Sequence, residues 1–224
     1  MMHREGVVLK KEIFKNLAGA TLLAASLLAG AQPVELIQEA EQGNAKAQYK
    51  LGEMLATGQG VPQNEAEAVK WFRLAAQQGH VDAQYNLGMM LVNGEGVPQN
   101  DAEAVKWYRL AAQQGDAYAQ YNLGVMLEMG RGVPQNDVEA SKWYQLAAQQ
   151  GYAAAQNNLS VMLALGKRVT RSPKQAYFWA LLAAAQVEKY KKNRDIVVKQ
   201  LNAKDRNEMQ ASASEWTPKV NSPR

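Results

Sequence analysis

The chain has 224 residues, of which 47% are hydrophobic and 8% aromatic, and its formal net charge is +4. It contains no cysteine and only two histidines, His3 and His80. This composition excludes disulfide bridges and zinc clusters built from cysteine and histidine, so the fold must be stabilised by packing alone.

The N-terminal region has the pattern of a secretory signal peptide. Basic residues between Arg4 and Lys15 precede an apolar run over 17–28. That run is about twelve residues long, shorter than the roughly 20 that a membrane-spanning helix needs. Ala29-Gly30-Ala31 then supplies a small-x-small cleavage pattern. We predict cleavage after Ala31 and export to the periplasm or the medium, without stable membrane insertion; the alternative is an uncleaved membrane anchor.

Positive charge is concentrated in the N-terminal segment and in the tail after residue 187, and no basic stripe crosses the centre of the chain. Nucleic-acid binding therefore has little electrostatic support. The tail contains a basic run over 189–194. Such a run is typical of a solvated helix face, and the alternative is contact with an acidic partner or an anionic membrane surface.

A nine-residue motif recurs every 36 residues through the rest of the chain. Trp71-Phe-Arg-Leu-Ala-Ala-Gln-Gln-Gly79 returns with small changes at 107–115 and at 143–151, and Trp179 continues the series in a degenerate fourth copy. A fixed period of this length is typical of stacked helical units that cover one another's apolar faces. The sequence predicts an all-α fold, a solenoid of helix-turn-helix repeats.

The second helix of each unit has clear start and stop signals. An asparagine N-cap followed three residues later by glutamate begins it, as at Asn64 and Glu67, and the pair is expected to cap the helix reciprocally. In the fourth copy Ser172 takes over the capping role and Pro173 the first helical position. The helix ends at a glycine suited to a left-handed C′ residue: Gly79, Gly115 and Gly151.

The first helix of each unit is predicted to begin at Asn44, His80 and Asp116, with an apolar stripe such as Ala47, Leu51 and Leu55. A glycine recurs in the middle of this helix at positions 52, 88 and 124, and Ser160 replaces it in the fourth copy. Because glycine disfavours helices, we expect a neighbouring backbone to pass close to Gly52, Gly88 and Gly124.

The period divides the chain into segments. They are a signal peptide (1–31), an N-terminal half repeat (32–43), four repeats (44–79, 80–115, 116–151 and 152–187), a C-terminal helix pair (188–216) and a frayed tail (217–224). In the helix pair, Asn202 is a plausible N-cap, and Met209 and Trp216 are expected to fold inward.

These motifs resemble the Sel-one-like (Sel1-like) repeat family, a subclass of the tetratricopeptide-like (TPR-like) helical solenoids. The third copy carries the family pattern from Ala119, Leu123 and Gly124 through Gly130-Arg-Gly132-Val133 to Trp143, Ala147 and Gly151. The family's tyrosine is replaced by leucine in all four copies, for example by Leu127. The resemblance implies a right-handed superhelix with a concave binding wall and an adaptor role. For exported bacterial members it also implies host-cell interaction, envelope functions or signalling control.

Variation between the copies suggests where a partner binds. One side of the first helix becomes more apolar from the first copy to the fourth, and the resemblance places it on the concave wall. Tyrosine, methionine and valine with interleaved asparagine suit a bound peptide or helix. The predicted partner-contact residues are Tyr85, Met89, Tyr118, Tyr121, Asn122, Val125 and Met129. The alternative is that these side chains pack helix against helix.

The sequence gives little support for an enzyme. His80 is the only histidine outside the signal segment, it occupies a capping position, and no Ser-x-x-Lys motif is present. We expect no metal, no cofactor and no catalytic residue, and a monomer that binds a protein or peptide. The recurring Trp71, Trp107, Trp143 and Trp179 are predicted to pack. The alternative function is a cell-wall-directed β-lactamase or a penicillin- or peptidoglycan-binding protein, as in cysteine-rich relatives.

Overall fold

The computed structural model describes residues 32–166 and 168–219, so the predicted signal peptide and the end of the tail lie outside the described residues. Every regular element of the described part is a helix. The helices come in consecutive hairpins, which confirms the predicted all-α solenoid class. The chain forms two compact units, one ending at Asn100 and the other beginning at Asp101. This boundary falls between the two helices of the predicted repeat 80–115.

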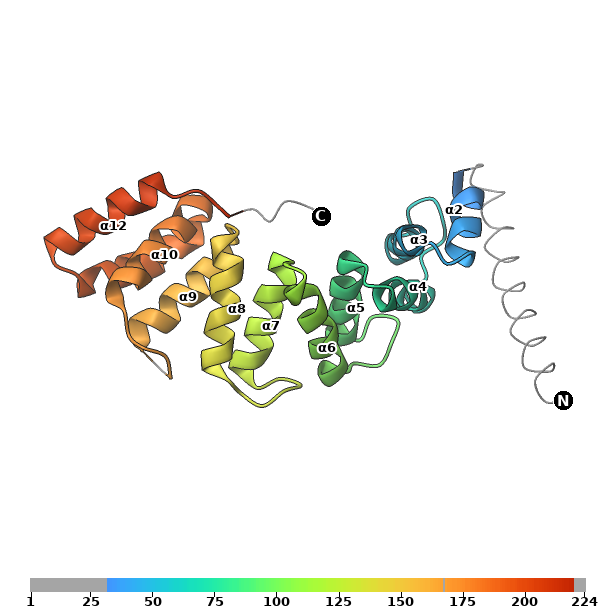
Figure 1. Cartoon of the computed structure of the whole chain (residues 1–224), viewed down its shortest axis with the longest axis horizontal. Coiled ribbons are helices and arrows are strands. Elements are labelled where there is room, and N and C mark those ends of the chain that lie inside the picture. Colours follow the sequence, from blue (N-terminus) through green and yellow to red (C-terminus); the bar gives the residue numbers. More distant parts are fainter. Residues whose placement is uncertain (1–31, 167, 220–224) are drawn as a thin grey trace, which may run out of the picture. The chain divides into compact units, whose positions relative to one another are not determined.

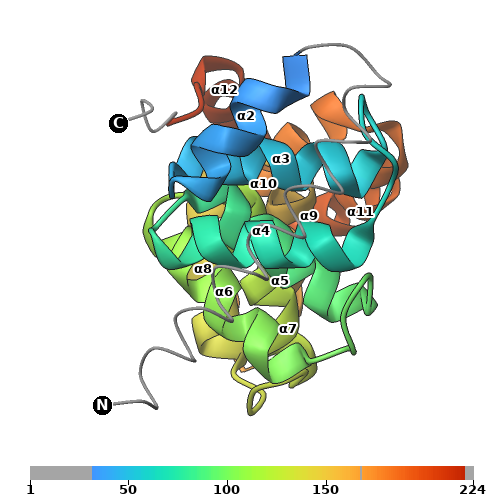
Figure 2. The same cartoon turned by 90° about the vertical axis from the view of Figure 1, so that its right-hand side faces the viewer.

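The first unit is built around a central hairpin. Its described helices are α2 (Gln32–Glu41), α3 (Ala45–Thr57), α4 (Glu65–Gln77) and α5 (Val81–Asn93). Helices α3 and α4 form the hairpin, α2 packs against α3, and α5 packs against α4 (Figure 2). The predicted stripe of Ala47, Leu51 and Leu55 is buried, as is Phe72 on the facing helix.

The second unit continues the same pattern and adds a different ending. Its helices are α6 (Asp101–Gln113), α7 (Ala117–Met129), α8 (Asp137–Gln149), α9 (Ala153–Leu165), α10 (Pro173–Gln186), η1 (Glu188–Tyr190), α11 (Lys191–Val197), η2 (Val198–Gln200) and α12 (Ala203–Glu215). Each helix from α6 to α10 packs against the one that follows it, and α12 lies beside α10 (Figure 1). The first of the two predicted C-terminal helices is a short α-helix flanked by 3₁₀ turns.

The helix starts use the predicted capping side chains. Asn44, His80 and Asp116 each accept a hydrogen bond from the backbone N–H three residues on, at the starts of α3, α5 and α7. Asn64 and Asn136 do the same for α4 and α8. His80 is thus a capping residue, as the sequence predicted.

The reciprocal half of the predicted cap is absent in the third repeat. The N–H of Asn136 donates instead to the carbonyl of Leu127, at 2.9 Å. With that donor satisfied, the Glu139 carboxylate is free to accept from Arg109, at 2.6 Å. The glutamate therefore joins α8 to α6 and does not close its own helix start.

Ser172 does not cap α10 in the predicted way. It occupies the N-cap position of α10, and Pro173 follows at the first helical position, but the serine side chain makes no capping hydrogen bond. The hydroxyl oxygen of serine lies one bond closer to the backbone than the amide oxygen of asparagine. The prediction that Ser172 takes over the capping role of asparagine is therefore wrong, because Ser172 holds the N-cap position without the capping hydrogen bond.

Gly52 and Gly124 face an aromatic ring and not a neighbouring backbone, so the prediction of a close backbone is wrong at these two positions. A Cβ atom on Gly124 would lie 2.7 Å from Cε1 of Tyr144, and one on Gly52 would lie 2.8 Å from the Phe72 ring. Each ring belongs to the second helix of the same hairpin. In the fourth repeat Ser160 and Ala180 hold the corresponding buried positions. In the fourth repeat the first helix thus has the larger serine in place of glycine, and the second helix has the smaller alanine in place of tyrosine.

The C′ glycines have the predicted left-handed backbone. The φ angles of Gly79, Gly115 and Gly151 are +88°, +97° and +91°. This conformation strains residues with a Cβ atom.

Buried glutamines connect successive repeats. Gln48, Gln84, Gln120 and Gln156 are at most 4% exposed. Each side-chain amide donates to an alanine carbonyl eight residues earlier, at 3.0–3.1 Å. The side-chain oxygens of Gln48, Gln120 and Gln156 also accept from a glutamine 30 residues later, at 2.7–3.0 Å. The hydrogen-bonding groups of these glutamines therefore find partners although the side chains are buried among apolar residues.

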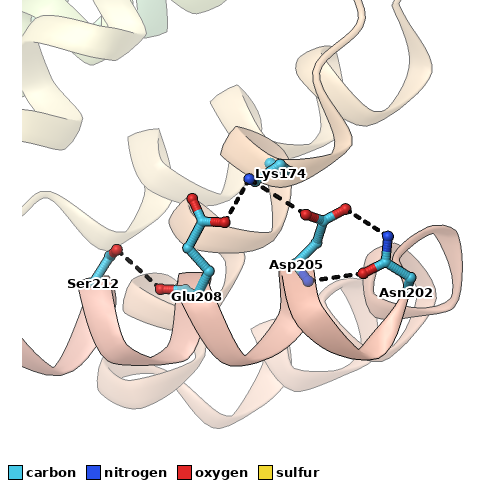
Figure 3. Close-up of polar contacts among 5 residues, drawn as sticks. All are labelled: Lys174, Asn202, Asp205, Glu208 and Ser212. Carbon is cyan, nitrogen blue, oxygen red and sulfur yellow. Dashed lines mark hydrogen bonds and ion pairs between the residues drawn. The ribbon is translucent and has the colours of Figure 1, made fainter.

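The C-terminal helix docks on α10 through charged groups. Lys174 lies 2.7 Å from the Glu208 carboxylate and 3.3 Å from that of Asp205 (Figure 3). Asn202 caps α12 by accepting from the N–H of Asp205, at 2.8 Å, as predicted. Met209 packs against the buried cluster that contains Tyr177, so its predicted inward orientation is confirmed.

Candidate functional site

In the first unit, the predicted partner-contact residues Tyr85 and Met89 lie on α5 and are partly buried. Tyr49 holds the same position as Tyr85 one repeat earlier. Its ring stacks on His80 with 4.5 Å between centroids, and its hydroxyl donates to Glu53 at 2.7 Å. Burial and this hydrogen bond raise the pKa of Tyr49. In the first repeat, the tyrosine on the predicted partner-contact side of the helix is therefore engaged in contacts within the chain.

In the second unit, the other five predicted residues lie along α7. Tyr118 is 53% exposed and Met129 is 71% exposed, while Tyr121, Asn122 and Val125 are partly buried. Tyr118 lies at the start of α7 and Met129 at its end, so the exposed members of the set mark the two ends of the helix.

Tyr121 differs from the exposed Tyr118 because its ring packs between two other rings. Its ring lies 5.8 Å from that of Tyr144 and 5.1 Å from that of Tyr152. Burial, together with the nearby Tyr190, raises its pKa. Tyr121 therefore packs helix against helix, which is the alternative that the sequence left open for the whole set.

A hollow of about 540 Å³ lies at the starts of α7 and α9. Tyr118, Tyr152 and Tyr190 line it together with the end of α10. The Tyr118 and Tyr152 rings meet edge to face, with centroids 5.1 Å apart. Of the predicted partner-contact residues, only Tyr118 lines this hollow. The hollow therefore lies nearer the starts of the helices than the predicted contact residues do.

The polar groups of the hollow are held in place by the glutamine network. Gln150 donates to the Gly115 carbonyl and to the Gln120 side chain, both at 2.9 Å. Lys189 lies over the Tyr190 ring, 5.1 Å from its centroid. Rigid tyrosine walls with fixed amides and one cation suit a peptide side chain or backbone.

Helix α11 extends the polar side of this face. The Asn193 amide donates to the Asn157 side chain at 2.7 Å, across a separation of 36 residues. Asn157 occupies the register position of Tyr121 one repeat later. Asn193 thus follows Asn157 by 36 residues, just as Asn157 follows Tyr121, so α11 continues this series of equivalent positions.

Sequence reasoning missed Tyr152 and Tyr190 as site residues. Tyr152 offered a signal, because it stands at the first-helix N-cap position, where the earlier copies have Asn44, His80 and Asp116. It makes no side-chain capping bond. An aromatic residue in place of a capping residue indicates a role other than capping. Tyr190 follows the last full copy, so the period offered no counterpart for comparison.

The described residues contain no cluster of three or more histidine, aspartate or glutamate side chains that could hold a metal ion. Nor does the described part contain a helix of sufficient length and apolarity to span a bilayer.

The comparisons with known proteins agree with the repeat architecture. The Sel1 repeat family model matches four consecutive segments, 45–80, 81–116, 117–152 and 153–187. The chain belongs to the Sel1 repeat family. Proteins of this family are generally protein-interaction scaffolds.

Two solved structures extend this comparison. A Sel1 repeat protein from Oxalobacter formigenes is 29% identical, with a TM-score of 0.71, and the match covers 89% of this chain and 84% of that protein. A protective antigen of uropathogenic Escherichia coli with an SLR fold is 30% identical, with a TM-score of 0.53. That match covers 80% of this chain but 47% of the antigen, so the chain spans about half its length. No curated protein sequence matches the chain.

Proposed function

We propose that this Sel1 repeat protein is an exported, non-enzymatic scaffold that binds a peptide or protein partner through the first helices of its repeats, in host-cell interaction or an envelope process. The observation that supports it best is the tyrosine-lined hollow at the start of α7, together with the exposed Tyr118 and Met129 on that helix. Family membership supports the scaffold role.

Binding would combine two kinds of contact. Tyr118, Tyr152 and Tyr190 would clamp one large side chain of the partner in the hollow. Val125 and Met129 would extend the apolar contact along α7. Aromatic rings give large contact areas at low entropic cost, so they are suited to anchoring a peptide.

A displayed random-peptide library tests the partner site. Peptides selected on the protein without residues 1–31 should bind the double variant Y118S/V125S at least tenfold more weakly. The matched control is V138S, which removes an apolar side chain that is 50% exposed on α8. Equal binding of all three proteins would contradict the site, and measurable nitrocefin hydrolysis would contradict the non-enzymatic assignment.

The export proposal rests on the basic, apolar and small-x-small pattern of residues 1–31. N-terminal sequencing of the protein recovered from the periplasm or medium should give Gln32 as the first residue. Changing Ala29 and Ala31 to larger residues should block processing. Recovery of the full-length chain in the cytoplasmic fraction alone would contradict export.

A further inference from the structure

The C-terminal segment covers part of the fourth repeat that stays exposed in the other repeats. The Trp216 ring meets the Trp179 ring edge to face, with 6.2 Å between centroids. Trp179 is 9% exposed and Leu182 is 8% exposed. One repeat earlier, the corresponding Leu146 is 43% exposed. The docked C-terminal region thus hides a second-helix surface that the third repeat presents to solvent.

The residues after Trp216 add a backbone contact. Pro218 lies over Gly151, with its Cγ 3.3 Å from where a Cβ atom on that glycine would be. The N–H of Lys219 donates to the carbonyl of Gln149, at 2.8 Å. The segment 216–219 is therefore held by the Trp179 ring, the carbonyl of Gln149 near the end of α8 and the surface of Gly151.

The same receiving residues recur within each unit. The equivalents of Gln149, Gly151 and Trp179 are Gln113, Gly115 and Trp143 in the second unit, and Glu41, Gly43 and Trp71 in the first. Each set is completed by the leucine one helical turn after its tryptophan, Leu146 or Leu74, which corresponds to the buried Leu182. Leu74 is 44% exposed, and a Cβ atom on Gly43 would meet no atom within 4 Å. We refer to these two sets as the outer tryptophan surfaces.

We propose that the outer tryptophan surfaces bind an extended Trp-x-Pro segment of a partner protein, in the way that residues 216–219 bind Gln149, Gly151 and Trp179. The occupant is identified by the segment already seated on the equivalent residues of this chain. The proposal adds a second interaction surface, on the second helices, to the first-helix site proposed above.

The charged contacts of α12 explain why the chain's own segment selects the fourth repeat. Lys174 pairs with Asp205 and Glu208, and Tyr177 accepts a hydrogen bond from Gln210 at 3.3 Å. The third repeat has Val138 in place of Lys174 and Ser141 in place of Tyr177. A partner on the outer tryptophan surface would therefore be recognised by its Trp-x-Pro segment, without an acidic helix before it.

A synthetic peptide tests this proposal on the full protein. A fluorescently labelled peptide of residues 212–219, Ser-Ala-Ser-Glu-Trp-Thr-Pro-Lys, should bind saturably, as measured by fluorescence anisotropy. The same peptide with the W216A change should not bind. The double variant L74S/L146S should bind about fivefold more weakly, because part of a leucine side chain is no longer buried. The control variant L165S, which changes a residue that is 67% exposed on α9, should bind as the wild type does.

The proposal would be overturned by no binding, by equal binding of the W216A peptide, or by equal binding by L74S/L146S. Equal binding by L74S/L146S would indicate exchange with the chain's own C-terminal segment. Self-association of the protein that W216A abolishes would reassign the surface to a second copy of the chain and would also overturn the proposal. Circular dichroism of each variant checks that its helices remain intact.

Discussion

The third and fourth repeats, both in the second unit, pack the same hairpin with different residues. The third places Gly124 under the ring of Tyr144. The fourth has Ser160 and Ala180 at these positions, both buried. The difference shows that the two positions share one volume, so a change at either one must be accompanied by a change at the other.

The loops of the two repeats differ in a related way. Gly132, with φ of +70°, stands so close to the backbone of Asp101 that no side chain fits between them. Arg168 replaces it in the fourth repeat, with φ of +60°, and lies 3.7 Å from the buried Asp137 carboxylate. A hollow of about 800 Å³, which includes Val138, opens beside this loop. The fourth repeat has exchanged a close backbone contact for an ion pair.

The largest expected effect comes from breaking the shared volume. Y144A should lower the free energy of unfolding by about 3–5 kcal/mol, because a buried ring is lost. G124S alone should cost about 1–3 kcal/mol through overpacking. The double variant G124S/Y144A reproduces the fourth repeat and should cost less than the sum of the two. Urea denaturation measures all three variants, and costs that add to within about 0.5 kcal/mol would contradict the coupling.

The loop comparison predicts the next largest effect. G132R places a side chain where the backbone of Asp101 leaves no room and should cost about 2 kcal/mol. The reverse change, R168G, relieves a left-handed residue but loses the ion pair with Asp137, so its effect should be smaller. Urea midpoints compare the two. A G132R protein as stable as the wild type would show that the close contact is dispensable.

Restoring the missing cap should stabilise the fourth repeat. S172N introduces the side chain that Asn136 uses, and should raise the free energy of unfolding by about 0.5–1 kcal/mol. S172A is the control and should change little, because the Ser172 hydroxyl makes no capping bond. Thermal denaturation followed by circular dichroism measures both variants. A destabilising S172N would mean that α10 cannot accept the longer cap.

The smallest effect is a pH dependence. Burial alone would raise the pKa of Glu139, but hydrogen bonds from Arg109 and Trp143 lower it. A lowered pKa means that the stabilisation is present above the ordinary glutamate range near pH 4.3 and is lost as the pH falls through the lowered value. E139Q, which supplies the residue of the fourth repeat, should therefore be about 0.5 kcal/mol less stable at pH 7. The gap should narrow as the pH falls below the ordinary glutamate range; a gap that stays constant would contradict the assignment.

The repeated sequence predicted the parts of the fold that depend on local chemistry. The capping side chains of Asn64 and Asn136 and the left-handed Gly151 follow from backbone requirements at helix ends. Contacts between residues on different helices were harder to predict. The period of 36 shows which residues hold corresponding positions, but not which residues contact each other. Thus the ring beside Gly124 was mistaken for backbone, and the hydrogen bond between Gln150 and Gln120 was not foreseen.

The candidate site was predicted only in part for the same reason. Comparison of the copies identified Tyr118 and Met129, which are exposed, but it included Tyr121, which is packed between other rings. Tyr190 lies after the last full copy, where the repeat comparison ends. Its position beside Tyr118 depends on how the C-terminal helices turn back, which no local pattern specifies.

Photocrosslinking tests the central claim, that the α7 face and its tyrosine hollow bind the partner, most directly. A photoreactive aromatic residue is placed at position 118 or 190 of the protein, or at the exposed control position 138, in the presence of a peptide selected on the wild type. The account predicts crosslinks from positions 118 and 190 and none from 138. Crosslinks from 138 alone, or equally from all three positions, would contradict it.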